Sequence, residues 1–379
     1  MKGEQHIAQP ATEKLTIVPL TADRYEEWDR FCLESPDAWF WQTTKWLEYS
    51  LHYRPELQSR SVSFMCLSES SPVAVCPLIV ETRIRDTGSN NEFSFGGDAG
   101  PSPALAANLS ERMRKEVLQR IFAFIDELAG KLKVARSIFR MSPLATSFWK
   151  ASIPQPNPFL SFGFSDISLS TQVIDLLPDE SQLLREMRKG HRADITRGNR
   201  LLQTTILNKQ TISPEAFERY RLLHQKAAGR VTRPRVTFEM TQAWIESGLA
   251  ILAVANLEGR DVGFALVTVY KDGAYYGSSC EDPEFNHLPI GHVMQWRILQ
   301  WLKENGFRRY EIGIQVHASQ PHTIVSGKEV KIAFFKRGFG GVAVPLWRAE
   351  KFYDVSYCFA VLQERNQQYS ATVLEPAQA

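Results

Sequence analysis

Residues 249–280 read LAILAVANLEGRDVGFALVTVYKDGAYYGSSC and decide the fold of this chain. Three apolar runs in this stretch are separated by polar, glycine-containing segments at 257–261 and 271–273. Runs of this length and composition, bounded by turn residues, are typical of β-strands joined by tight turns. The stretch therefore predicts a meander of three antiparallel strands.

A loop that contains Pro283 and Pro289 follows the meander. Residues 290–305 then predict a helix, and Gly306 is well suited to its C-terminal end because glycine adopts the left-handed conformation without strain. A strand over 309–314 completes the unit. The order is therefore a meander, a loop, a long helix and a further strand.

The first half of the chain repeats this order. Apolar runs at 61–67 and 72–83 predict a hairpin, and a loop rich in Gly and Pro follows at 96–103. An apolar stripe over 111–128 predicts a helix, and 135–141 predicts a strand. A repeat of this length is a duplicated domain rather than a solenoid. The order is that of acetyltransferase-like folds. We therefore expect two tandem α/β (α+β) domains of this type, each a mixed, mostly antiparallel sheet flanked by helices. Two unrelated α+β domains are the alternative.

The length supports this division, because a chain of 379 residues exceeds the ~250–300 residues at which single cores stop growing. We predict a disordered tail over 1–14, a first domain over 15–165, and a second domain over 166–379 that ends in a C-terminal helix. Three prolines between 152 and 164 mark the boundary.

Composition excludes several classes of protein. The 44 Lys and Arg residues against 42 Asp and Glu give a net charge of +2, which does not suggest a DNA-binding protein. The five cysteines form no CxxC pair, which disfavours a disulfide framework or a zinc ribbon and fits a reducing compartment. A polar N-terminus and the lack of an apolar run of ~20 residues predict a cytoplasmic protein without a transmembrane segment, compatible with peripheral contact with a membrane-bound substrate.

Five segments, in this order along the chain, resemble those of Fem-type peptidoglycan aminoacyltransferases. They are Phe40-Trp-Gln-Thr-Thr-Lys-Trp46, Gly97-Asp-Ala-Gly-Pro101, the basic segment at 184–200, the segment at 303–311 that ends in Tyr-Glu, and Phe335-Lys-Arg-Gly-Phe-Gly-Gly341. The last is the sharpest match, to a Phe-Lys-x-Gly-Phe-Gly element. The resemblance covers roughly residues 35–350.

The resemblance implies transfer of an aminoacyl group from a charged tRNA onto an amine of a cell-envelope precursor, such as an amino sugar, a peptide or a lipid-linked glycan. Broader relatives with the same tandem core use acyl-CoA, so the alternative is an acyl-CoA-dependent N-acyltransferase. A non-catalytic protein that binds a sugar nucleotide or tRNA is a third hypothesis. Either donor is a co-substrate, and no permanently bound cofactor is expected.

Amide formation requires an amine that loses a proton, a polarised carbonyl and a fixed donor. Lys336 is the first catalytic candidate, because a cation there could stabilise the oxyanion or the leaving oxygen or sulfur. Asp98, in the glycine-rich loop, could orient or deprotonate the amine. Glu281 follows the last strand of the second meander and could face the cleft. Each candidate also has a non-catalytic alternative: Lys336 could be a solvated surface residue, Asp98 an Asx-turn residue, and Glu281 a solvent-facing carboxylate.

Further residues are candidates for substrate binding. In the basic segment, Arg188 and Arg192 would share one helix face, and arginine suits contacts with a diphosphate or a tRNA backbone. Family members that bind a nucleotide-linked muropeptide carry a Lys at the position of Ser50, so that acceptor is disfavoured here. The remaining candidates are Arg197, Arg337, His52, Arg54 and His292.

Two common kinds of site are disfavoured. Acyl-CoA-dependent acetyltransferases place an (Arg/Gln)-x-x-Gly-x-(Gly/Ala) loop before the long helix, whereas this chain keeps only Gly291 of that pattern and has Pro289, which lacks an N–H donor. The histidines at 287, 292, 317 and 322 match no zinc spacing, so no metal is expected. We expect Lys336, Arg192 and Asp98 to converge in a groove between the domains, where ligand sites are common.

Overall fold

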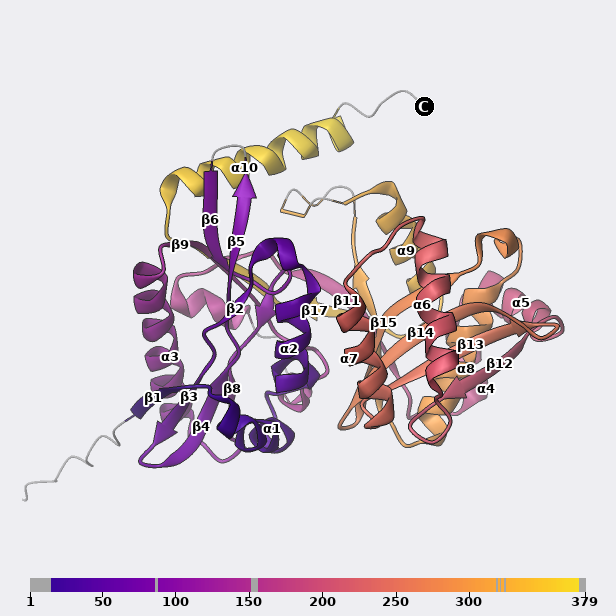
Figure 1. Ribbon diagram of the computed structural model, residues 1–379, viewed down its shortest axis with the longest axis horizontal. Coiled ribbons are helices and arrows are strands. Elements are labelled where there is room, and N and C mark those ends of the chain that lie inside the picture. The colour runs from indigo at the N-terminus through magenta and orange to yellow at the C-terminus, as the bar shows by residue number, and fades with distance from the viewer. Residues whose placement is uncertain are drawn as a thin grey trace, which may run out of the picture.

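The computed structural model describes residues 15–85, 88–150, 156–317, 320, 322–323 and 325–374. The predicted tail at 1–14 lies outside the described residues. The chain forms two halves that stand side by side, the first drawn in indigo to magenta and the second mainly in orange (Figure 1).

The first half holds two sheets. The smaller one has the strand order β1-β3-β4-β8, made of Leu15–Pro19, Phe64–Ser68, Ser71–Cys76 and Ala104–Leu105. The larger one has the order β10-β18-β9-β6-β5-β2, made of Ser165–Asp166, Arg348–Phe352, Val134–Arg140, Gly88–Phe93, Ile79–Arg85 and Arg60–Ser61, with β7 (Gly100–Pro101) also paired to β9. Its helices are α1 (Tyr25–Glu34), α2 (Thr44–Tyr53), α3 (Glu111–Lys131) and α10 (Val355–Tyr369).

The second half is built on one sheet of order β12-β13-β14-β15-β16-β11-β17. Its strands are Gln203–Leu207, Ala250–Leu257, Arg260–Tyr270, Gly273–Glu281, Arg309–Gln315, Leu169–Asp175 and Val342–Leu346. Its helices are α4 (Glu180–Glu186), α5 (Lys189–Gly198), α6 (Pro214–Ala228), α7 (Arg235–Glu246), α8 (Ile290–Glu304) and α9 (Gly327–Arg337).

Both halves contain the same parallel strand pair around a long helix. In the second half β15 and β16 flank α8 and pair in parallel only from Gly273 to Tyr275, after which they diverge. In the first half β6 and β9 flank α3 and are likewise parallel. The remaining strand pairs are mostly antiparallel. The predicted fold class is confirmed: the chain has two tandem GNAT-like domains.

One predicted hairpin differs from the structure. The run at 72–83 is two strands, since β4 pairs with β3 in the smaller sheet whereas β5 pairs with β6 in the larger one. Pro77 stands between the two strands, and proline cannot donate to a strand ladder, so this residue marks the division that the hairpin prediction overlooked.

The C-terminal segment leaves the second sheet and returns to the first. Strand β18 pairs with β9 over Arg348–Phe352, and Tyr357 and Val361 of α10 are buried against Ala135 of β9. The predicted division at residue 165 stays a prediction, but the larger sheet of the first half contains these residues from the end of the chain (Figure 1).

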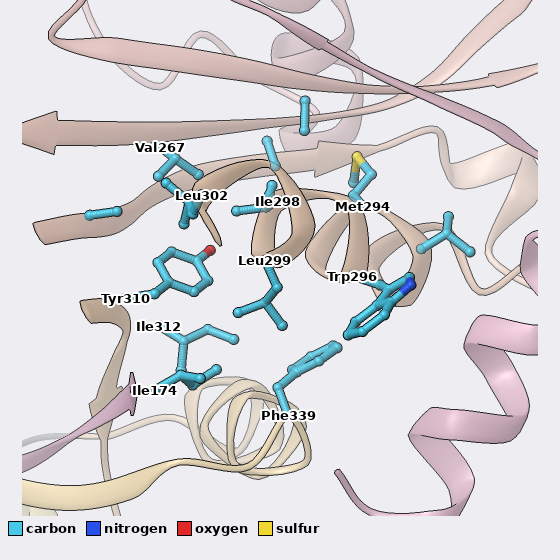
Figure 2. Close-up of a cluster of buried hydrophobic side chains, with 14 of the residues drawn as sticks. Ile174, Val267, Met294, Trp296, Ile298, Leu299, Leu302, Tyr310, Ile312 and Phe339 are labelled. Carbon is cyan, nitrogen blue, oxygen red and sulfur yellow. The ribbon is translucent and has the colours of Figure 1, made fainter. Parts of the chain in front are cut away.

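The two halves share a buried core. Figure 2 shows the core of the second half alone, where Leu299 and Tyr310 pack between α8 and the sheet.

A separate aromatic cluster lies between the halves and joins Trp39 and Phe40 of the first half to Trp244 and Tyr270 of the second. At its edge the Trp39 indole donates to the Tyr270 carbonyl at 3.1 Å, and the Lys271 ammonium donates to two backbone carbonyls of the first half. These contacts fix the halves relative to each other.

All five cysteines are free thiols, four of them buried. Within the part of the chain that the structure describes, no helix has the length and apolar character required to cross a membrane.

Candidate active site between the two domains

Two cavities lie between the halves. The larger one, about 1070 Å³, is bounded by α2 and the Phe95–Ala99 loop on one side and by α6, α7 and the strands β14 and β15 on the other. The smaller one, about 500 Å³, lies between the first sheet, α10 and α9. Asp98 lines both cavities, so this residue stands between them.

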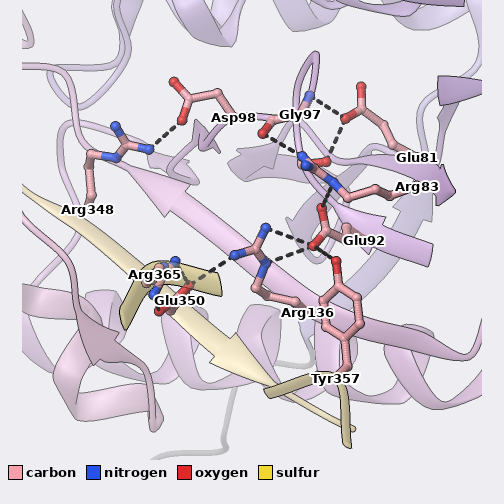
Figure 3. A network of polar contacts seen from close by, with 11 residues as sticks. Glu81, Arg83, Glu92, Gly97, Asp98, Arg136, Arg348, Glu350, Tyr357 and Arg365 are labelled. Carbon is pink, nitrogen blue, oxygen red and sulfur yellow. Dashed lines mark hydrogen bonds and ion pairs between the residues drawn. The ribbon is translucent and has the colours of Figure 1, made fainter. Parts of the chain in front are cut away.

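A tight turn presents Asp98 at this junction. Phe95 and Asp98 exchange backbone hydrogen bonds of 2.8 and 3.2 Å, and the two central residues, Gly96 and Gly97, have φ of +61° and +79°. Such a turn favours glycine at both central positions. The buried carboxylate of Glu81 accepts the N–H groups of Gly96 and Gly97, each at 2.7 Å (Figure 3). The predicted glycine-rich loop is therefore a rigid support for Asp98.

Asp98 keeps its negative charge. Its carboxylate pairs with the guanidinium of Arg348 (Figure 3). Partial burial alone would raise the pKa of Asp98, but the charges of Arg348 and Arg140 and the N–H of Ala99 lower it overall. A carboxylate with a lowered pKa is a weak base. It is better suited to holding an ammonium group than to deprotonating one.

Lys336 lies in the smaller cavity, on the last turn of α9. This helix starts at a capping box formed by Ser326 and Glu329. The Lys336 side chain enters the gap where β15 and β16 diverge: its Nζ lies against Gly313, 5.7 Å from the centre of the Tyr276 ring. Burial lowers the pKa of Lys336, and the negative charge of Glu311 partly offsets this effect.

Glu311, on β16, is a buried carboxylate close enough to Lys336 to affect its charge. It is 3% exposed and accepts a hydrogen bond of 2.8 Å from the Thr171 hydroxyl. Burial raises the pKa of Glu311 to about 7, although Thr171 and the charges of Arg140 and Lys336 act in the opposite direction. Glu311 thus titrates close to neutral pH and influences the charge on Lys336.

Replacing Glu311 by glutamine should change the pH dependence of stability. The folded pKa is raised, so the contribution of Glu311 is fully present below the ordinary pKa of a glutamate and is lost as pH rises from about 4.5 to about 7. We expect Glu311→Gln to match the parent at pH 5 and to exceed it at pH 8 by up to about 3 kcal/mol. Urea unfolding at both pH values measures this, with Glu34→Gln, at an exposed carboxylate, as the control. An equal stability difference at both pH values would contradict it.

The larger cavity is aromatic and basic. Its walls include Trp41, Trp46, Tyr49, Tyr53 and Trp244, together with four arginines at 54, 140, 230 and 233 against the two carboxylates of Glu56 and Asp98. Within the described residues Arg233 has no carboxylate partner: it donates to the hydroxyls of Tyr49 and Tyr220 and lies 4.0 Å from the centre of the Phe238 ring. The Nε atoms of Arg140 and Arg233 and the Trp46 indole N–H are buried without a hydrogen-bond partner. The cavity is therefore suited to a ligand with an anionic group and flat or apolar faces.

Glu281 and His292 do not line either cavity. His292 lies on the first turn of α8, and Glu281 is the last residue of β15. The Glu281 carboxylate accepts a hydrogen bond from the backbone of Gly291, and burial raises the pKa of Glu281. The His292 ring packs against His191 and Phe335, and burial lowers the pKa of His292 to about 4. The prediction that Glu281 faces the cleft is corrected, because the end of β15 turns toward α8.

The basic segment is not one helix. The chain is extended at Met187 and Arg188, so α4 and α5 are separate helices. The break is a tertiary effect, because the Arg188 N–H donates to the carbonyl of Gly338 at 2.8 Å. Arg192 donates to the carbonyls of Arg185 and Met187. The expected convergence of Arg192 with Lys336 and Asp98 is therefore wrong, since the Arg192 side chain supports the α4–α5 connection and lines neither cavity.

The other binding candidates are distributed over the surface and one cavity. Arg197 pairs with Asp194 at 3.0 Å, and Arg337 lies near Phe334 on α9, 5.9 Å from its ring centre. His52 is hydrogen-bonded to the Glu48 carbonyl of its own helix. Arg54 alone among them lines the larger cavity.

Four residues of this region were missed by sequence reasoning as site components: Arg140, Arg348, Glu311 and Trp46. Trp46 and Glu311 belong to motifs that were recognised, but no signal marked their side chains as cavity or charge partners. Arg140 and Arg348 stand at the ends of strands β9 and β18 without any surrounding motif. Within the described residues, no group of three or more His, Cys, Asp or Glu side chains could hold a metal ion.

Residues 185–321 match the family model described as an acetyltransferase (GNAT) domain. The second half of the chain contains a GNAT domain. The matched residues include α8 and the diverging strands β15 and β16, against which Lys336 packs. The chain therefore contains an acyltransferase domain. No curated protein sequence matches it.

Solved structures extend the likeness over both halves. A crystal structure of FemX is similar over 92% of this chain and 100% of its own, with 12% identity and a TM-score of 0.62. The C-terminal domain of a putative lysylphosphatidylglycerol synthetase from Agrobacterium fabrum covers 91% of this chain and 96% of its own (14% identity, TM-score 0.53). L-PGS from Bacillus licheniformis covers 88% and 97% (16% identity, TM-score 0.50). At these identities the likeness shows the fold, and both halves of the GNAT pair take part in it.

Proposed function

We propose that this protein transfers an acyl group, carried as an aminoacyl ester on tRNA, onto an amine of an anionic cell-envelope precursor. The observation that carries the proposal is the position of Asp98 in the walls of both cavities, one of which is also lined by Lys336. The acceptor amine would reach Asp98 through the larger cavity, and the donor ester would lie beside Lys336 in the smaller one.

The reaction would be a direct transfer. The amine nitrogen attacks the ester carbonyl carbon, a C–N bond forms, and the C–O bond to the donor breaks. Asp98 would hold the incoming ammonium, which loses one proton to solvent before the attack. The ammonium of Lys336 would stabilise the oxyanion and donate a proton to the leaving oxygen. The nitrogen, positively charged once the C–N bond has formed, would release its second proton to solvent, and Lys336 would regain a proton from solvent. No covalent intermediate on the enzyme is needed.

The acceptor would be anionic. Arg140 and Arg233, which have no carboxylate partner in the part of the chain that the structure describes, place positive charge beside the aromatic walls. Arginine binds phosphate or carboxylate through two parallel hydrogen bonds. The names of the similar structures, FemX and lysylphosphatidylglycerol synthetase, favour an envelope component, and a lipid-linked acceptor would require peripheral contact with a membrane. An acyl-CoA donor is the second candidate, favoured by the GNAT match.

A basic surface beside α9 favours the tRNA donor. It comprises Arg185, Arg188 and Lys189, for which no carboxylate partner is found among the described residues, with Arg337 on the neighbouring helix. The Arg188 guanidinium lies 3.8 Å from the centre of the Phe334 ring and donates to the Phe334 carbonyl. Several unpaired cations on one surface fit a phosphate backbone.

Charge reversal tests this surface. We expect the double variant Arg185→Glu/Lys189→Glu to weaken retention of aminoacyl-tRNA by about tenfold or more and to reduce the slope of log K against log salt by about 2. Filter retention at several salt concentrations, with tRNA charged with each amino acid in turn, gives both values and names the amino acid. The matched control is Arg112→Glu/Lys115→Glu, an exposed pair on α3. Equal effects of both double variants, or a parent that retains no aminoacyl-tRNA, would reject the tRNA donor.

A further inference from the structure

The start of α8 is the place where a GNAT domain offers backbone N–H groups to an anion. Here the first N–H groups of α8 are already in use. The N–H groups of His292 and Val293 donate to the Pro289 carbonyl at 3.1 and 3.2 Å, and that of Gly291 donates to the Glu281 carboxylate. Of the first four helical residues, Ile290 alone keeps an N–H without an assigned partner, and this residue is fully buried.

The same place is filled by side chains. A Cβ atom added at Gly291 would lie 2.6 Å from Glu281 Oε1 and 3.2 Å from Phe335 Cζ, so no space remains beside this backbone. Helix α5 covers it from another side, because an added Cβ at Gly198 would overlap Val293 and lie 2.9 Å from Pro289 Cγ. At this position a pyrophosphate therefore finds no exposed N–H donor, since Ile290 is buried, and no room.

The gap between β15 and β16 is also occupied. Where two parallel strands diverge, their facing backbone groups are free to pair with an extended ligand. In this chain α9 supplies the occupant, since the Lys336 side chain runs into the gap against Gly313 and beside Tyr276. An acyl-CoA would need both the space at the start of α8 and the gap between the strands. Phe335 fills the first and Lys336, its neighbour on α9, fills the second.

We infer that the second domain has lost the acyl-CoA site that its fold provides, with Glu281 and the Phe335-Lys336 end of α9 in its place. Glu281 is then a specificity-determining residue rather than a catalytic one. The inference deepens the proposed function and rests on it only for the role of Lys336: a donor must approach Lys336 from the smaller cavity between the halves, not along α8.

Hydrogen exchange of the full-length protein with acetyl-CoA as the probe tests this inference. We expect no change in exchange over residues 290–293 up to about 1 mM acetyl-CoA, the upper end of ordinary KM values. We also expect the Gly291 amide of the parent to exchange slowly, and about tenfold or more faster in Glu281→Ala, where its acceptor is missing. Saturable acetyl-CoA binding that protects 290–293, or a Gly291 amide that exchanges freely in the parent, overturns the inference.

Three further outcomes separate this inference from the proposed function. If acetyl-CoA binds but protects only residues elsewhere, the second-domain site is absent as inferred and the tRNA donor is in doubt. If neither acetyl-CoA nor aminoacyl-tRNA binds, the inference stands and the proposed function fails. Transfer from acetyl-CoA with protection of 290–293 would overturn the inference and leave acyl transfer itself intact.

Discussion

Replacing Lys336 by methionine is expected to lower kcat for acyl transfer by about 10²–10³-fold, the usual effect of removing one oxyanion-stabilising group. Methionine keeps most of the length of the side chain, so the gap between β15 and β16 stays filled and the fold should persist. The proposed acceptor site is the other cavity, so the Kd of the acceptor should not change. Single-turnover transfer and equilibrium binding of the acceptor measure the two effects separately.

The matched control is Lys331→Met, at an exposed position of the same helix, which should leave kcat unchanged. Burial lowers the pKa of Lys336, so its ammonium loses its proton at a lower pH than that of an ordinary lysine. The alkaline limb of the pH–activity profile of the parent should therefore be shifted to lower pH. Full activity of Lys336→Met would reject the site. Loss of turnover together with loss of acceptor binding would favour a structural role for Lys336.

Replacing Asp98 by asparagine is expected to lower kcat/KM for the amine acceptor by roughly 10- to 100-fold, the range that corresponds to about 1.5–3 kcal/mol for a hydrogen bond to a charged group. Most of the effect should appear as a higher KM, because the proposed role of Asp98 is to hold the ammonium, and its lowered pKa makes it a weak base. Since the pKa of Asp98 is lowered, KM should not rise with acidity until well below neutral pH.

The control for Asp98 is Asp126→Asn, which removes another paired carboxylate of the first half, the partner of Lys351, away from both cavities. It should leave KM unchanged. A thermal melt checks that the unpaired Arg348 has not loosened the first sheet. A fall in kcat with KM constant would instead assign Asp98 to the chemical step and would revise the mechanism.

Much of the fold was predictable because its signals are local. The turns at 257–261 and 271–273 and the helix that Gly306 follows depend on residues a few positions apart, and the structure contains the expected meander and α8. The glycine-rich loop was recognised too, since Gly96 and Gly97 must adopt positive φ. Where a tertiary contact competes with local preference, prediction failed: the bond from Arg188 to Gly338 splits the basic segment, which the family resemblance implied to be one helix.

The sequence by itself determined that this protein has two tandem domains of one kind, and it indicated Lys336 and Asp98, because periodicity, turn residues and motif order are properties of neighbouring positions. Only the tertiary structure decided what surrounds them. Asp98 meets Arg348 across 250 positions of sequence, Glu311 lies beneath Lys336, and Glu281 turns away from the cleft. Contacts between distant segments depend on how sheets and helices pack, and no local pattern encodes which side chains that packing brings together.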